Sequence, residues 1–223
     1  MRSFAKYSDA DPNGSGKIVS FYGNALIGPD WDSGNTWNRE HVWCQSHSID
    51  NATGTQLWGE TYGGSDLHHL RPIEMTENST RNNNPYGEVS NHNSSYLKYP
   101  KDKNKNVLTN YPAGYLVNGV WEPMDNKKGD VARIVLYVYT HYNTYSNVGG
   151  TKDNSSYSTY FGNLPITNIM ATSTESAAWD MLVRWNNLDP VDNLETTRNN
   201  VAAKYQGNRN PFIDHPEYAC KIW

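Results

Sequence analysis

Two adjacent side chains, Glu40 and His41, stand at the centre of the stretch WNREHVW (residues 37–43). The imidazole of histidine has an unperturbed pKa of about 6.5, so it can accept a proton near neutral pH. The carboxylate is a hard oxygen ligand of the kind that Mg²⁺ prefers. A histidine base beside a carboxylate-held divalent metal is suited to cleaving a phosphodiester bond with water.

A second stretch, DLHHLRPIEMTENSTRNNN (residues 66–84), contains further polar residues at helical spacing. Glu74, Asn78 and either Arg81 or Asn82 are separated by three or four residues, which places them on one face of a helix. A carboxylate, an amide and a guanidinium on one face suit a metal beside a phosphate. They suit a solvated helix face as well, and spacing alone favours that interpretation.

The geometry of a regular strand opposes a shared site for Glu40 and His41. Successive side chains of a strand point to opposite faces. Both residues can serve one site only if a strand end or a bulge redirects one of them.

The surrounding pattern predicts the elements that must hold these side chains. Residues 1–16 read as an N-terminal arm, and 17–223 as a single domain without repeats or a dividing linker. Strands are expected at 17–24 and 36–43, the second delivering Glu40 and His41. A short helix of about three turns is expected over 73–83, because Pro72 precedes it and acids fill its first turn.

The second half of the chain predicts more helix. Gly129 and Asp130 should cap a buried helix, DVARIVLYVYTHY, and Thr174 should start another over 175–188. A third helix should end at Gly207. Strand-like pieces are YLKYP and GYLVNGVWEP, and the tail from Asn208 reads as loop. Strands followed by helices in this way predict an α+β fold.

Composition limits the classes of function. The 223 residues carry a net charge of −4, which excludes a protein wrapped in basic surface, so any contact with nucleic acid must be local. Mean hydropathy is −0.81 and no apolar run approaches the about 18 residues of a membrane helix, so no membrane span is expected. Cys44 and Cys220 could form a disulfide or remain free thiols.

The runs NREHVW, DLHHLRP and NSTRNN, in this order, resemble the bacterial endonuclease I family. The later pieces GDVAR, DPVDNLETTRNN and QGNRNPFIDHPE are similar to the same family's C-terminal half. The resemblance implies a ββα-metal (His-Me finger) core with additional C-terminal helices, in which a hairpin end and a short helix grip one metal. It also implies a secreted or periplasmic protein whose leader is absent from this chain.

The resemblance assigns roles by motif position. Glu40 matches the acidic metal ligand, His41 the general base and Asn78 the amide metal ligand, whereas Arg81 fills an arginine position that contacts phosphate or structure. The implied cofactor is Mg²⁺, with Mn²⁺ or Ca²⁺ as other candidates. The implied reaction is hydrolysis of DNA and RNA, with little sequence preference, to 5′-phosphate products by a monomer.

The chain also departs from the family pattern. Members with an arginine between the two motifs use it on the cleaved phosphate. This chain has none there, so Arg39, Arg71 or Arg81 must serve. The sequence around the D-L-H motif carries Asp66, His68 and His69, which are expected to orient the site from behind without touching the metal. Cys44 stands where the family usually has proline, and Gly63, Gly64 and Ser65 replace an acidic residue found in some members.

Two other functions fit parts of the sequence. A metal-free ribonuclease would use two histidines, such as His41 and His69, as acid and base. A secreted carbohydrate-binding module would use the 16 Tyr and 8 Trp and would cleave nothing. Trp37 or Trp43, if exposed, could stack on a nucleic-acid base.

Overall fold

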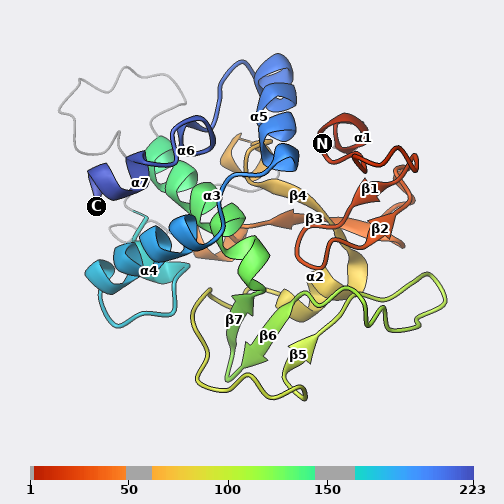
Figure 1. Cartoon of the computed structure of the whole chain (residues 1–223), viewed down its shortest axis with the longest axis horizontal. Helices are drawn as coiled ribbons and strands as arrows, with labels where there is room; N and C mark the ends of the chain where they lie inside the picture. Colours follow the sequence, from red (N-terminus) through yellow and green to blue (C-terminus); the bar gives the residue numbers. More distant parts are fainter. Residues whose placement is uncertain (1–2, 49–61, 144–163) are drawn as a thin grey trace.

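The computed structural model describes residues 3–48, 62–143 and 164–223, and the elements of these segments are shown in Figure 1. The strands are β1 (Ile18–Val19), β2 (Leu26–Ile27), β3 (Trp37–His41), β4 (Leu70–Glu74), β5 (Leu97–Lys98), β6 (Gly114–Val117) and β7 (Val120–Pro123). The α-helices are α1 (Ala5–Ser8), α2 (Met75–Arg81), α3 (Asp125–Asn143), α4 (Glu175–Leu188), α5 (Asn193–Gln206), α6 (Pro211–Asp214) and α7 (Tyr218–Ile222). The predicted α+β class is confirmed.

The strands of the described residues form small antiparallel sheets. β1 pairs with β2, β3 pairs with β4, and β6 lies between β5 and β7. The expected strand over 17–24 is reduced to two residues of β1. The pieces YLKYP and GYLVNGVWEP supply β5, β6 and β7, as the sequence predicts.

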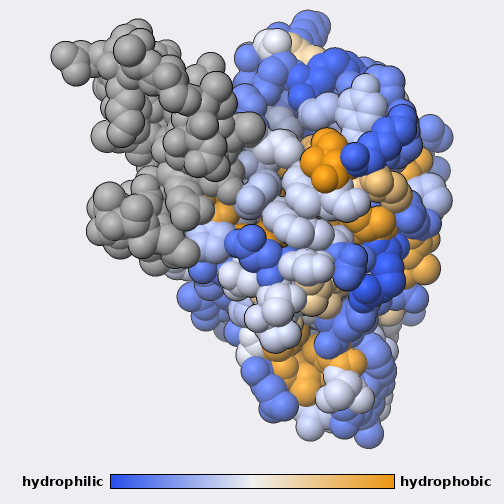
Figure 2. Space-filling model, turned by 90° about the vertical axis from the view of Figure 1, so that its left-hand side faces the viewer, coloured by the Kyte–Doolittle hydropathy of each residue, from blue (hydrophilic) through white to orange (hydrophobic). Residues whose placement is uncertain are grey.

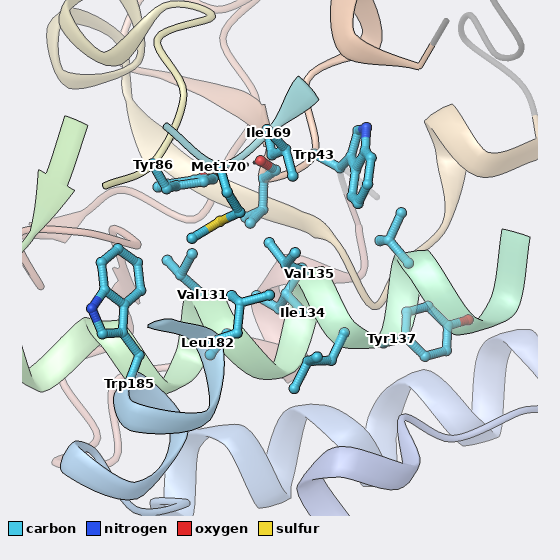
Figure 3. Close-up of a cluster of buried hydrophobic side chains, with 14 of the residues drawn as sticks. Trp43, Tyr86, Val131, Ile134, Val135, Tyr137, Ile169, Met170, Leu182 and Trp185 are labelled. Carbon is cyan, nitrogen blue, oxygen red and sulfur yellow. Dashed lines mark hydrogen bonds between the residues drawn. The ribbon is translucent and has the colours of Figure 1, made fainter. Parts of the chain in front are cut away.

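Helix α3 runs through the main hydrophobic core and packs on α4. Figure 3 shows Val131, Ile134, Val135 and Tyr137 on this helix, surrounded by side chains from other parts of the chain. The neighbours labelled there are Trp43, Tyr86, Ile169, Met170, Leu182 and Trp185, and all of them are buried. The core therefore joins the β3 region to the C-terminal helices.

The predicted start of α3 at Gly129 is wrong. The helix begins at Asp125, and Gly129 lies inside it. A Cβ atom at position 129 would lie 2.0 Å from the carbonyl oxygen of Asp189. The glycine therefore allows close packing between two segments and does not cap the helix.

Two other predicted helices are confirmed by their caps. The hydroxyl of Thr174 accepts from the amide of Ala177 at the start of α4. Asp192 forms a capping box with Glu195 at the start of α5, and Gly207 ends α5 in the left-handed conformation. The tail differs from the prediction, because α6 and α7 interrupt the expected loop.

The N-terminal residues pack against α5. Phe4 and Ala5 are buried, and the guanidinium of Arg198 on α5 forms a buried ion pair with Asp9. The part of the N-terminal arm that the structure describes is thereby fastened to the C-terminal half.

Figure 2 shows a mostly hydrophilic face on which hydrophobic residues appear in scattered groups. Among the described residues, no helix combines the length and apolar character needed to cross a membrane.

Candidate active site

Strands β3 and β4 carry the two sequence motifs and pair directly with each other. His41 lies opposite Leu70 and Glu40 lies opposite Arg71 in the antiparallel register. β4 leads without a loop into α2, because Glu74 ends the strand and its carboxylate accepts from the amides of Thr76 and Glu77 as the helix N-cap. The predicted helix over 73–83 is therefore shorter, Met75–Arg81.

Helix α2 is fixed against the N-terminal part of the chain by a buried carboxylate. Glu77 accepts from the hydroxyl of Ser20 at 2.8 Å and from the amide of Gly23 at 2.7 Å. Both contacts come from the segment that joins β1 to β2. They hold the helix, and with it Asn78, in place beside β3 and β4.

Glu40 is buried on the side of β3 that faces α2. Its Oε1 accepts from the hydroxyl of Tyr22 at 2.7 Å and lies 3.5 Å from Nη1 of Arg81. Burial raises the pKa of Glu40, although the charge of Arg81 and the hydrogen bond from Tyr22 oppose this shift. Among the described residues, no group donates a hydrogen bond to Oε2, so this oxygen is available to another partner.

Asn78 shares the helix face of Arg81, three residues away, and Arg81 reaches Glu40. Its half-buried side chain makes no hydrogen bond within the part of the chain described here. Glu40 and Asn78 thus offer a carboxylate and an amide oxygen from neighbouring elements. This donor set fits Mg²⁺, which uses few protein oxygens and keeps several waters. Within the described segments, no three His, Cys, Asp or Glu side chains are grouped so that they could hold a metal ion.

His41 is half-buried at the end of β3, and its Nε2 lies 2.8 Å from the carbonyl oxygen of Gly64. A carbonyl can only accept, so Nε2 carries the proton and Nδ1 carries the lone pair. Arg39 lies two residues before His41 on β3, so the two side chains share a strand face, and Arg39 is half-buried.

His69 makes the same kind of contact as His41, but with the carbonyl of the preceding glycine, Gly63. Its Nε2 lies 2.5 Å from the carbonyl oxygen of Gly63, and its ring centroid is 5.6 Å from that of His41. Its exposed fraction is 0%. The two histidines therefore hold consecutive carbonyls of the turn Tyr62–Ser65, and only His41 is open to solvent.

Asp66 anchors this turn to the helical half of the molecule. Its carboxylate accepts from the hydroxyls of Tyr137 and Tyr142, each at 2.7 Å, and from the amide of Gln206 at 3.0 Å. Burial alone would raise the pKa of Asp66, but the neighbouring histidines and these hydrogen bonds hold it below its ordinary value. His68 also contacts the helical half of the molecule, because its Nε2 lies 3.0 Å from the carbonyl oxygen of Asn208.

The structure buries two of the three arginines that the sequence offers for phosphate contact. Arg81 has an exposed fraction of 0% and donates to the carbonyl of Val42 at 3.1 Å and to the sulfur of Cys44. Arg71 is 3% exposed and lies over the ring of Phe21 at 5.5 Å. We therefore assign both guanidinium groups to the interior, which leaves Arg39 as the arginine placed beside His41.

The structure also decides the expectations for two tryptophans and the two cysteines. Trp37 and Trp43 are both 0% exposed, so neither can stack on a base. Cys44 and Cys220 are free thiols.

A clamp that the sequence did not reveal joins the D-L-H-H-L motif to α5. Arg198 donates to the carbonyls of Leu67 and Leu70, and the amide nitrogen of Leu67 donates to Gln206 at 2.8 Å. Arg209 pairs with Asp214 instead of facing the site. Arg198 lies in the run DPVDNLETTRNN and Gln206 in the run QGNRNPFIDHPE, but neither run indicates which segment of the chain it contacts.

The burial of His69 predicts a dependence of stability on pH. Burial, and secondarily the charge of His41, lowers the pKa of His69 from 6.5 to about 4. The unfolded chain therefore binds a proton between pH 6.5 and 4 that the folded chain does not. The free energy of unfolding should fall by about 3 kcal/mol as the pH is lowered through this window.

Denaturant unfolding at several pH values checks this prediction. His69→Gln, which keeps a donor for the Gly63 carbonyl, should flatten the dependence between pH 6.5 and 4. His215→Gln, at an exposed position, should leave the wild-type profile in place. An unchanged slope in the His69 variant would refute the explanation.

The chain is similar to known proteins over nearly its whole length. A family model described as Endonuclease I matches residues 3–217. The chain is similar to the "Extracellular ribonuclease" of Bacillus subtilis (strain 168), at 35% identity over 222 residues, and to that of Bacillus amyloliquefaciens, at 34% over 226 residues. Each alignment covers 98% of this chain and 65% of the relative, so the chain spans about two thirds of their length. The chain belongs to the Endonuclease I family.

Proposed function

We propose that this protein is a metal-dependent endonuclease that hydrolyses phosphodiester bonds of DNA and RNA to 5′-phosphate products. The observation that carries the proposal is that β3 ends at His41, directly after Glu40, which is the strand end that a site shared by these two residues requires. The Gly64 carbonyl fixes the proton of His41 on Nε2, and Glu40, the residue before it, has one carboxylate oxygen to which no described group donates. The family match and the printed names of the relatives, both ribonucleases, support a nuclease.

His41 would act as the general base. Its Nδ1 carries the lone pair and would take a proton from the attacking water. The resulting imidazolium keeps its hydrogen bond from Nε2 to the Gly64 carbonyl, which stabilises the positive charge and holds the ring still. The turn that bears this carbonyl is fixed through His69 and Asp66, so the orientation of the base depends on buried groups.

Glu40 and Asn78 would hold the metal, with Mg²⁺ as the first candidate and Mn²⁺ or Ca²⁺ as others. When bound, the ion supplies positive charge that stabilises the phosphoryl oxygens and the leaving 3′-oxygen. Glu40 must be ionised to serve as a ligand, and because burial raises its pKa, acid should weaken metal binding at a higher pH than it would for an exposed glutamate. Arg81 and Tyr22 keep the Glu40 carboxylate in one orientation.

The structure weakens the two alternatives. In a metal-free ribonuclease His69 would have to reach the substrate, yet its side chain is fully buried and bonded to Gly63. A carbohydrate-binding module would use aromatic residues on the surface, and Trp37, Trp43, Trp121 and Trp185 cannot serve in this way because they lie in the interior.

The relatives' names also support the proposed setting, a secreted enzyme acting outside the cell. Because contacts to phosphates carry no base information, sequence preference should be slight. Water replaces the 2′-hydroxyl as nucleophile, so DNA and RNA should both be cut. We propose that the enzyme acts as a monomer.

Removal of the metal tests this function. Supercoiled plasmid and single-stranded RNA should be cleaved with Mg²⁺ and left intact with EDTA, and excess Mg²⁺ should restore cleavage. The products should carry 5′-phosphate ends, which ligation without prior phosphorylation detects. Cleavage of RNA alone that persists in EDTA and leaves 2′,3′-cyclic ends would overturn the proposal in favour of the metal-free ribonuclease.

A further inference from the structure

The burial of Arg71 and Arg81 leaves the candidate site short of groups that could hold a long anionic substrate. A chain with a net charge of −4 needs a local concentration of cations for this purpose. Within the described segments, the lysines that form no ion pair are Lys17, Lys98, Lys101, Lys103, Lys105 and Lys204. Most of them lie in one short stretch, residues 98–105, which we name the lysine loop.

The lysine loop carries four lysines and one aspartate, a local charge of +3. Lys103 and Lys105 are exposed, and Lys98 and Lys101 are half-buried. The single acid, Asp102, faces its own loop: its carboxylate accepts from the amides of Asn104 and Asn106, each at 2.8 Å. The lysine side chains are therefore the charged groups that this loop presents to solvent.

The loop has a defined conformation. The Asp102 amide donates to the carbonyl of Asn106 at 2.9 Å, and Lys101 bridges to Val107 across the loop. Lys105 has a φ of +66°, a conformation that glycine or asparagine adopts more readily than lysine. This backbone conformation is strained for a lysine. Strained residues of this kind cluster at functional sites. A preformed set of lysines loses less conformational entropy on binding a ligand.

The position of the loop relates it to the candidate site. The amide of Lys101 donates to Oε2 of Glu74, the N-cap of α2, at 3.2 Å. At the other end of α2, Arg81 lies 3.5 Å from Glu40. Seven residues of helix separate these contacts, roughly 10 Å at about 1.5 Å per residue. Figure 1 shows the connection between β5 and β6 lying beside α2.

We propose that the lysine loop binds the phosphate backbone of the nucleic-acid substrate a short way from the cleaved bond, because α2 connects this loop to the candidate site. This inference rests on the proposed nuclease function. The loop would contribute affinity without sequence preference and would take no part in bond cleavage. Its loss should therefore raise KM on long substrates and leave kcat near the wild-type value.

The test measures binding of a labelled 20-base-pair duplex by fluorescence anisotropy between 0.05 and 0.3 M salt. The full chain carries His41→Ala so that the duplex stays intact, and the wild type with EDTA gives a second series without that substitution. Lys103→Gln with Lys105→Gln should lower the salt slope of the binding constant by about 2, or about 1 for each lysine. At 0.1 M salt the affinity should fall by at least about tenfold.

A matched control makes the outcome specific. Lys17→Gln with Lys204→Gln removes the same charge from two other exposed lysines that form no ion pair, and it should leave the slope close to that of the parent. Equal slopes for the loop variant and the parent would overturn the loop proposal while leaving the nuclease function standing. Failure of the parent itself to bind the duplex at low salt would count against the proposed function.

Discussion

Substitution of His41 by alanine should lower the rate of phosphodiester cleavage by about 10²- to 10⁴-fold, the usual contribution of a positioned general base. The imidazole lies at the end of β3 with its Nε2 bonded to the carbonyl of Gly64, so alanine removes both the base and its contact with the turn. The loss should appear in kcat, while the affinity for nucleic acid changes little. Plasmid nicking and RNA cleavage at saturating substrate measure it.

A histidine on the surface provides the comparison. His215→Ala changes an exposed side chain next to α6 and should cleave at the wild-type rate. Unfolding curves of both variants should resemble the wild type, because His41 is only half-buried. A His41→Ala protein that folds and still cleaves within a few-fold of the wild-type rate would remove the base from the mechanism.

Glu40→Gln should lower the rate of cleavage to a similar extent, for a different reason. The amide has nearly the shape of the carboxylate and can keep the hydrogen bond from Tyr22, but it loses the negative charge that Arg81 and the proposed metal both require. Activity should return in part as the Mg²⁺ concentration is raised. The free energy of unfolding should fall by about 1–3 kcal/mol, because a buried charged partner of Arg81 is lost.

Stability and activity can be separated with a second buried glutamate. Glu122 is buried and pairs with Lys128 at 2.7 Å on the β7 side of α3. Glu122→Gln should lose stability to a similar degree and keep the wild-type cleavage rate. Equal loss of cleavage in the two variants would mean that the Glu40 effect is one of folding alone.

The helices whose caps are local could be predicted from the sequence, and the ones shaped by distant contacts could not. Thr174 and Asp192 bond amides three residues away, so the starts of α4 and α5 are local properties. Gly129 looks like a helix cap in the sequence. In the structure, a glycine is required there because the backbone of Asp189, distant in sequence, packs closely against it. Such a close approach leaves no trace in the residues around Gly129.

The candidate site divides in the same way. The WNREHVW motif predicts the strand that bears Glu40 and His41, and the segment after Pro72 predicts the helix that carries Asn78. The burial of Arg71 and Arg81 was not predictable, because arginines in such motifs suit phosphate contact as well as interior hydrogen bonds. Every residue of β4 is buried, and this depends on segments distant in sequence such as Phe21 and α5. The metal-binding role of the β3–β4–α2 unit itself stays a prediction.

Direct measurement of metal binding tests the central claim, that Glu40 and Asn78 hold a divalent ion beside His41. Mn²⁺ titrated into the folded protein can be followed by the electron paramagnetic resonance signal of the free ion. We predict one tight site in the wild type and in His41→Ala, and at least about tenfold weaker binding in Glu40→Gln and Asn78→Ala. Equal affinity in all four proteins would contradict the account.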